Sequence, residues 1–94
     1  MNRLELVERL AERNNASKAE IDRIIVSALE EISAAVSQGE TVTLIGFGTF
    51  KCVERAARTG RNPSSGEKIH IPPTKKPRFI PGTRFTELMN GQRD

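Results

Sequence analysis

Basic side chains gather in one polar stretch of this sequence, residues 55–78. The stretch holds seven Lys and Arg residues against one carboxylate, and only four of its residues other than proline are apolar. Such a segment cannot form a core, but its cations can bind a polyanion by replacing the counterions on phosphates. Near its centre, the run 62–66 combines proline and glycine in a turn signal. We interpret the stretch as a protruding basic β-arm that binds nucleic acid.

Other kinds of chemistry find no support in the sequence. It contains no paired carboxylates, metal-ligand cluster, phosphate-binding glycine loop or catalytic triad, so we expect neither an enzyme nor a cofactor. Cys52 and His70 are too few ligands for a structural zinc. There is no zinc finger, basic zipper or cationic recognition helix for the major groove. Four Phe with no Trp or Tyr argue against single-strand binding by base stacking.

Length and charge distribution indicate what kind of protein and binding partner to expect. The 94 residues make one domain with a thin core, which favours oligomerisation. Residues 1–45 carry five Lys/Arg and eight Asp/Glu, whereas residues 46–94 carry ten and four. A basic half joined to an acidic half suggests a polyanion that is contacted by one face only. The lone cysteine fits a reducing compartment, and no signal peptide or membrane span is recognisable, so we expect a cytoplasmic protein.

The N-terminal part of the sequence is expected to form two helices. Residues 2–14 form one helix, with Asn2 as the N-cap and Glu5 three residues later. Residues 17–39 form a longer helix that begins with the pair Ser17 and Glu20 and ends at a glycine. Its apolar stripe suggests that a partner subunit covers it. The stripe consists of Ile21, Ile24, Ile25, Ala28, Leu29, Ile32, Ala35 and Val36.

Alternation with a period of two begins at Thr41 and predicts strands. A turn at residues 46–48 leads to a returning strand at 49–53, which continues into the basic arm. After the arm tip, residues 68–71 alternate again, and Pro72-Pro73 interrupts the strand ladder. Residues 78–80 return to the core, and a short helix follows Pro81-Gly82. The fold class is therefore α+β.

With its elements in this order, the chain resembles the bacterial HU / integration host factor family of DNA-bending proteins. The resemblance covers nearly the whole chain, and it favours the HU branch. It rests on the runs Ile45-Gly46-Phe47-Gly48-Thr49-Phe50, Arg55-Ala56-Ala57-Arg58-Thr59-Gly60-Arg61-Asn62-Pro63, Gly66, and Pro77-Arg78-Phe79-Ile80-Pro81-Gly82.

The resemblance implies an intertwined homodimer with a three-stranded antiparallel sheet in each subunit and one protruding β-ribbon arm. Residues 1–94 would be a single domain. Within it, residues 1–40 form a helical dimerisation base, 41–81 form the sheet and arm (with the arm at about 54–76), and 82–91 form a C-terminal helix. The family implies non-sequence-specific binding and bending of double-stranded DNA through the minor groove, with association to the nucleoid. Because bending costs energy, nicked or already bent DNA should be preferred.

The resemblance also implies roles for particular residues. Pro63 matches the wedge that enters between base steps, with Arg61 and Asn62 beside it in the minor groove. Phe47 and Phe79 match core aromatics, as does Phe50. The other implied DNA contacts are Arg3, Gly46, Gly48, Arg55, Arg58, Lys68, Lys75, Lys76, Arg78 and Arg84.

Three local departures from the family pattern stand out. Thr83 occupies a position where lysine is common, with Arg84 next to it. His70 replaces a usual cation, and Pro72-Pro73 should stiffen or kink the returning strand. Residues 90–94 extend beyond the usual end. Three alternatives stay open: a heterodimer with a paralogue that prefers particular sequences, a protein-interaction module whose basic arm docks on an acidic partner, and an RNA-binding protein.

Overall fold

The structure, a computed structural model, describes residues 1–91. It divides into two compact units, one over Met1–Ala34 and one that begins at Ala35. Within the described residues, no helix is long and apolar enough to cross a membrane. Most of the predicted C-terminal extension, residues 92–94, lies outside the described residues.

Helix α1 spans Arg3–Asn14 and begins where the sequence predicted. The side-chain Oδ1 of Asn2 accepts a hydrogen bond from the backbone N–H of Glu5 at 2.9 Å. This bond satisfies one of the amide groups that the first turn of a helix leaves without a partner. The helix ends at Asn15, which adopts the left-handed conformation with φ +52°.

Helix α2 spans Lys18–Ser37 and is defined at both ends by the signals predicted from the sequence. At the start, Ser17 Oγ accepts a hydrogen bond from Glu20 N–H at 3.1 Å. At the end, Gly39 has φ +89°, a conformation that glycine adopts without steric cost. Its N–H donates to the carbonyl of Val36 at 3.0 Å, so one of the last carbonyls of the helix is satisfied.

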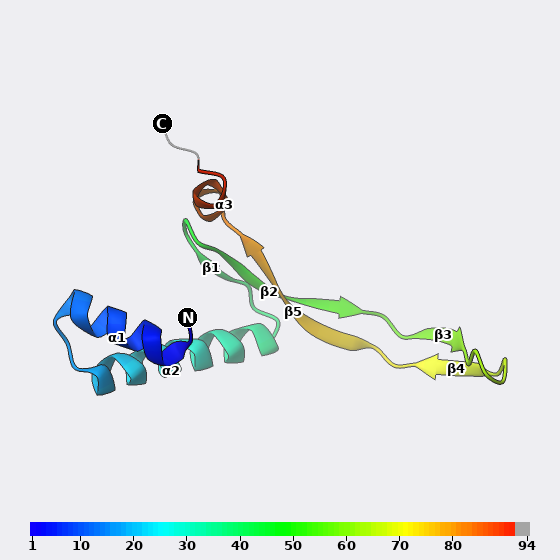
Figure 1. The fold of residues 1–94 in the computed structure, drawn as a ribbon. Coiled ribbons are helices and arrows are strands. Elements are labelled where there is room, and N and C mark those ends of the chain that lie inside the picture. Colours follow the sequence, from blue (N-terminus) through cyan, green and yellow to red (C-terminus); the bar gives the residue numbers. More distant parts are fainter. Residues whose placement is uncertain (92–94) are drawn as a thin grey trace. The chain divides into compact units, whose positions relative to one another are not determined.

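Five strands form two antiparallel sheets (Figure 1). The first sheet has three strands in the order β1 (Val42–Leu44), β2 (Gly48–Arg55) and β5 (Thr74–Pro81), with β2 in the centre. The second has two, β3 (Arg58–Arg61) and β4 (Lys68–Ile71). The predicted α+β class and the three-stranded antiparallel sheet are therefore confirmed.

A short turn joins β1 to β2. Gly46 has φ +86°, and the N–H of Phe47 donates to the carbonyl of Leu44 at 2.9 Å. The glycine is needed here because this backbone conformation is strained for residues with a side chain. Helix α3 (Thr83–Met89) begins after Gly82, whose N–H donates to the Phe47 carbonyl at 2.8 Å and so ties this helix to the turn.

All four phenylalanines of the chain form one cluster on this sheet. The rings of Phe50 and Phe79 have centroids 4.9 Å apart, and Phe47 stacks on Phe85 of α3 at 5.1 Å. The three rings predicted as core aromatics do pack together, but the predicted core role holds only in part, because Phe50 and Phe79 are half-buried and Phe47 is 45% exposed. The cluster fixes the root of the arm, because β2 and β5 contribute to it and then continue outward.

Gly48 is buried beneath this cluster, and its lack of a side chain is required there. A Cβ atom at this position would lie 2.5 Å from Cζ of Phe79 and 2.7 Å from the carbonyl oxygen of Ile80. The Gly48→Ala variant should therefore lose about 1–3 kcal/mol of unfolding free energy through overpacking. Urea denaturation measures the loss. Gly60→Ala is the control, since its Cβ would meet only side-chain atoms, the nearest being the end of the Ile71 side chain at 3.0 Å, and no backbone. Equal stability of the two variants would contradict the packing argument.

The chain by itself covers little of its apolar surface. Among residues 1–91, only Val7, Ala11 and Val36 are buried hydrophobic residues. On the predicted stripe of α2, Ile24 is 57% exposed and Leu29 is 54% exposed. Part of the apolar stripe of α2 is therefore exposed to solvent in the single chain.

Candidate nucleic-acid interface

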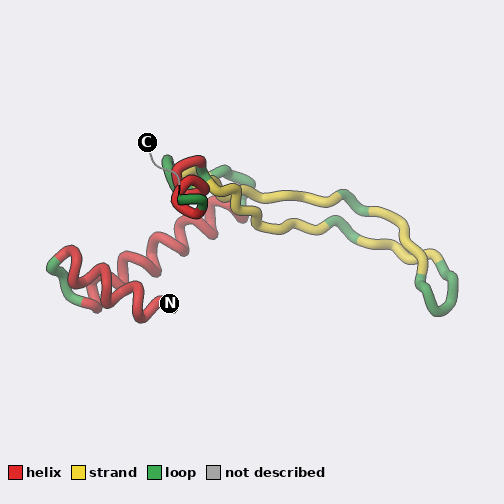
Figure 2. The backbone as a smooth tube through the Cα atoms, turned by 45° about the horizontal axis from the view of Figure 1, so that its top comes forward, coloured by secondary structure: helices red, strands yellow, loops and turns green. Residues whose placement is uncertain are grey.

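The arm is a two-stranded ribbon that continues outward from β2 and β5 (Figure 2). The ladder between β2 and β5 ends where Arg55 lies opposite Thr74, and the ladder between β3 and β4 begins where Arg58 lies opposite Ile71. Two residues on each side, 56–57 and 72–73, are thus unpaired between the two ladders, and the register is the same before and after this gap. The predicted interruption at Pro72-Pro73 is confirmed, because proline has no N–H to donate to a ladder.

The arm ends in a tight loop between β3 and β4. The N–H of Gly66 donates to the carbonyl of Asn62 at 2.7 Å, and the N–H of Asn62 donates to the carbonyl of Glu67 at 2.8 Å. Gly66 has φ +74°, as the turn signal predicted. Pro63 lies exposed within this loop, at the far end of the ribbon (Figure 1). The loop therefore presents an uncharged ring at the end of the ribbon, close to Arg61, whose Nη1 donates to the Gly66 carbonyl at 3.4 Å.

Cations line one face of the ribbon near its root. Residues directly opposite each other on neighbouring strands share a face, and successive residues alternate between faces. Lys51 is paired with Arg78 in this way, and the next residues on the same face are Lys76 and Arg55. Lys75, opposite Glu54, lies on the other face. A shallow groove follows the cationic face and is lined by Val53, Arg55, Thr74, Lys76, Pro77 and Arg78.

The distal hairpin separates its side chains in the same manner. Arg61 lies opposite Lys68, and the same face holds His70. Arg58 shares the other face with Ile71. The arm thus carries cations on both faces. In this hairpin, more of them lie on the face of Arg61 and Lys68. Nearer the root, more of them lie on the face of Lys51 and Arg55.

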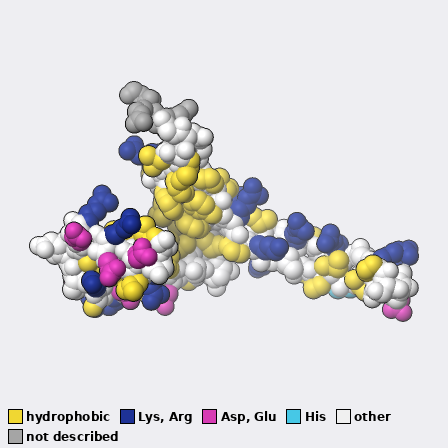
Figure 3. Space-filling view, in the orientation of Figure 1, with side chains coloured by type: hydrophobic (Ala, Val, Ile, Leu, Met, Phe, Trp, Pro, Cys, Tyr) yellow, Lys and Arg dark blue, Asp and Glu magenta, His cyan; other side chains and the backbone are white. Residues whose placement is uncertain are grey.

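The basic residues of the arm take part in none of the ion pairs found among the described residues. Within residues 1–91, the ion pairs join Arg3 to Asp22 and Lys18 to Glu8, and all four residues belong to the helical unit. Figure 3 shows Lys and Arg side chains at intervals along the arm. No salt bridge among the described residues neutralises these cations, which is typical of a surface that binds a polyanion.

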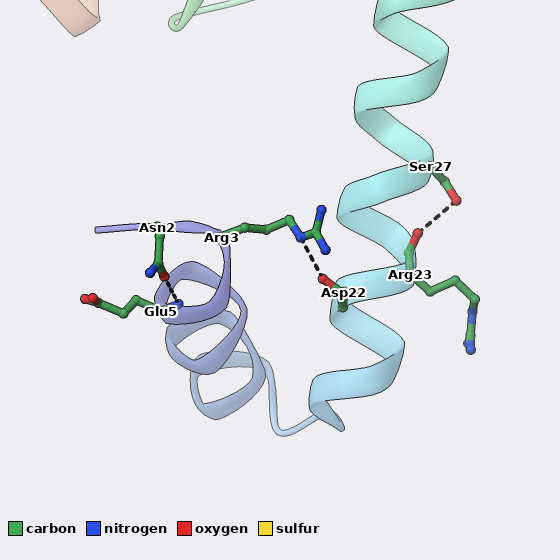
Figure 4. A network of polar contacts seen from close by, with 6 residues as sticks. All are labelled: Asn2, Arg3, Glu5, Asp22, Arg23 and Ser27. Atoms are coloured by element: carbon green, nitrogen blue, oxygen red, sulfur yellow. Dashed lines mark hydrogen bonds and ion pairs between the residues drawn. The ribbon is translucent and has the colours of Figure 1, made fainter.

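Arg3 differs from the predicted contacts on the arm, because it already has a partner. Its Nε lies 3.1 Å from Oδ1 of Asp22 on α2, at the first turn of α1 (Figure 4). The side chains of the pair are 61% and 43% exposed, and such a surface pair contributes only about 0–1 kcal/mol. The ion pair is thus weak enough for Arg3 to exchange the carboxylate for a phosphate.

The two glycines predicted to contact DNA have different surroundings. Gly46 is exposed, and a Cβ placed on it would lie 3.7 Å from Cδ of Arg84, so the structure brings these two predicted contacts together. Gly48 is buried and has the packing role described above. The approach to phosphate proposed for both glycines stays a prediction.

Lys51 was not among the predicted DNA contacts. It precedes the basic stretch, but it lies directly opposite Arg78 on the cationic face of the root. Its position could have been found from the alternation of β2, since Lys51 and Arg55 are four residues apart on one strand and therefore share a face.

Comparison with known proteins identifies the family. The model of the family described as Bacterial DNA-binding protein matches residues 1–90. The chain belongs to this family. Among its members, the DNA-binding protein HU of Nostoc is 48% identical over 87 residues, which cover 93% of either chain. The SPbeta prophage-derived DNA-binding protein HU 2 of Bacillus subtilis is 48% identical over 92 residues, covering 98% of this chain and 100% of the relative.

Solved structures of this family have the same fold. An HU–DNA cocrystal structure from Anabaena matches with a TM-score of 0.84 and 46% identity, over 98% of this chain and 100% of that one. A mutant HU from Thermotoga maritima matches with a TM-score of 0.70 and 28% identity, over 95% and 99%. The resemblance to HU proteins inferred from the sequence motifs is confirmed.

Proposed function

We propose that this protein is an architectural protein of the bacterial nucleoid that binds and bends double-stranded DNA without sequence specificity. The observation that carries the proposal is the arm: a ribbon whose cations form no ion pair among the described residues and which ends in an exposed proline. Cations bound to phosphates supply affinity that does not depend on sequence. The kinship with HU proteins, one of them crystallised with DNA, supports the same conclusion.

The arm suits the minor groove. This groove is about 6 Å wide and has phosphates along both walls. A ribbon with cations on both faces can contact both walls, as Arg58 on one face and Arg61 on the other would do. Pro63 would then enter between base steps and kink the duplex, at a cost of a few kcal/mol for unstacking. Nicked or bent DNA has lost part of that stacking, so the protein should prefer it.

The active form in this proposal is a homodimer. A chain that leaves Ile24 and Leu29 more than half exposed requires a partner to cover its apolar stripe. In the second unit, Ile45 is fully exposed and Leu88 is 70% exposed, so apolar surface of this unit also needs a cover. A second copy supplies complementary apolar faces and a second arm, which doubles the number of phosphate contacts.

Removal of charge from the arm tests this proposal. Replacing Arg58 and Arg61 together by alanine removes four cations from a dimer. The slope of log K against log salt concentration should become shallower by up to about 3.6, or about 0.9 for each lost phosphate contact. Fluorescence anisotropy with a duplex at several salt concentrations measures this slope.

The matched control removes the same number of charges from the helical unit. Arg9 and Arg13 are exposed on α1 and were not predicted to contact DNA. Their double alanine variant should keep the slope of the wild type. A slope that changes equally in both variants would mean that net charge, and not the arm, determines binding. An RNA duplex in the same titration tests the RNA-binding alternative.

A further inference from the structure

Asn62 takes part in three hydrogen bonds of the arm tip. Its backbone N–H donates to the Glu67 carbonyl at 2.8 Å, and its own carbonyl accepts from Gly66 N–H at 2.7 Å. Its side-chain Oδ1 accepts from the backbone N–H of Ser64 at 2.9 Å. Asn62 is also half-buried, whereas Pro63 and Ser64 are exposed.

The side-chain bond encloses Pro63 in a small ring of covalent and hydrogen bonds. An asparagine whose side chain accepts from the amide two residues later forms an Asx turn. The proline has a fixed φ of about −65°, and it also restricts the residue before it to extended conformations. With the Asx bond in place, the backbone on both sides of the pyrrolidine ring is constrained. The direction of that ring is thus set before any DNA is bound.

We propose that Asn62 is a positioning residue for the Pro63 wedge, acting through its Oδ1 bond to the Ser64 amide, and not primarily a reader of the minor groove. The assignment rests on the proposed function, because a wedge needs orientation only if it enters DNA. A wedge that is already ordered does not have to lose conformational freedom when it inserts. Asn62 therefore favours the bent complex over a straight complex held by phosphate contacts alone.

Two substitutions of Asn62 separate positioning from direct contact. Asn62→Ala removes the acceptor, whereas Asn62→Asp keeps an oxygen for the Ser64 amide but loses the side-chain N–H₂ and adds a negative charge. Hydrogen exchange of the Ser64 amide, measured by NMR on the free protein, should accelerate about three- to tenfold in the alanine variant. It should stay near the wild-type rate in the aspartate variant.

The effect of each variant on DNA bending is measured by FRET between the ends of a duplex that is saturated with protein. We expect Asn62→Ala to lose at least half of the bend that Pro63→Ala loses, with an unchanged salt slope, since no cation is removed. We expect Asn62→Asp to bind more weakly but to retain the wild-type bend at saturation. Ser65→Ala, which removes the bond from the Glu67 N–H to Ser65 Oγ (3.3 Å), should leave the bend unchanged.

A double-mutant cycle completes the test. If Asn62 acts through Pro63, adding Asn62→Ala to Pro63→Ala should produce no further loss of bend. Additive losses, or equal losses of bend in the alanine and aspartate variants, would overturn the positioning role in favour of a direct contact through the N–H₂ group. Failure of the proposed function itself is distinguishable, because the wild-type protein would then not bend the duplex at all.

Discussion

Replacing Leu29 with glutamate is expected to separate the dimer and to weaken DNA binding by at least about 100-fold. Leu29 lies in the apolar stripe of α2 and is 54% exposed in the single chain. Glutamate forms helices about as well as leucine, so the helix itself should persist. At a two-fold interface, however, the change buries two carboxylates, each at a cost of several kcal/mol. A separated subunit has one arm and loses the gain from binding with two.

Ser27→Glu is the matched control for this variant. It adds the same charge to the same helix. Because Ser27 is two residues from Leu29 and a helix has 3.6 residues per turn, its side chain lies on roughly the opposite side of the helix. Sedimentation should give a dimer for wild type and Ser27→Glu and a monomer for Leu29→Glu. A dimer of unchanged stability in Leu29→Glu would show that the exposed stripe of α2 is not the subunit interface.

Replacing Pro63 with alanine is expected to reduce the bend far more than the affinity. The arm cations stay in place, so the phosphate contacts and their salt dependence should be retained. Without the stiff ring at the tip, the base step stays stacked and the kink is lost. Because the cost of unstacking then disappears as well, the dissociation constant should change by less than about tenfold. FRET across a duplex and a binding titration on the same sample measure the two effects.

Ser64→Ala is the control at the arm tip, because it keeps the backbone N–H that Asn62 accepts and leaves the proline ring intact. It should bend DNA as the wild type does. An unchanged bend in Pro63→Ala would show that the proline is only a turn residue and that the kink, if there is one, has another origin.

Much of the fold could be predicted from the sequence because local signals determine it. The Asn2 and Ser17 caps, the glycine at position 39 and the turn at Gly66 all act within a few residues, and each occurs where predicted. The break in the arm was also predictable, since Pro72-Pro73 cannot donate to a ladder. The family motifs then supplied the order in which these elements combine.

The remaining features depend on contacts between residues far apart in the sequence. The burial of Gly48 depends on a ring from β5, which a reading of the β2 sequence alone does not reveal. The position of Lys51 on the cationic face depends on the strand register. For Asn62, the family resemblance implied a contact with the minor groove, whereas in the structure its side-chain oxygen accepts a hydrogen bond within the loop. The predicted boundary of the helical base at residue 40 stays a prediction, and the two compact units divide within α2.

Sequence-independent binding of double-stranded DNA is tested by titrating the wild-type protein with duplexes of unrelated sequence over a range of salt concentrations. We expect dissociation constants that agree within about tenfold for all intact sequences, tighter binding to a nicked duplex, and a steep loss of affinity with salt. A preference of about a thousandfold or more for one sequence, or the absence of DNA binding at moderate salt, would contradict this expectation.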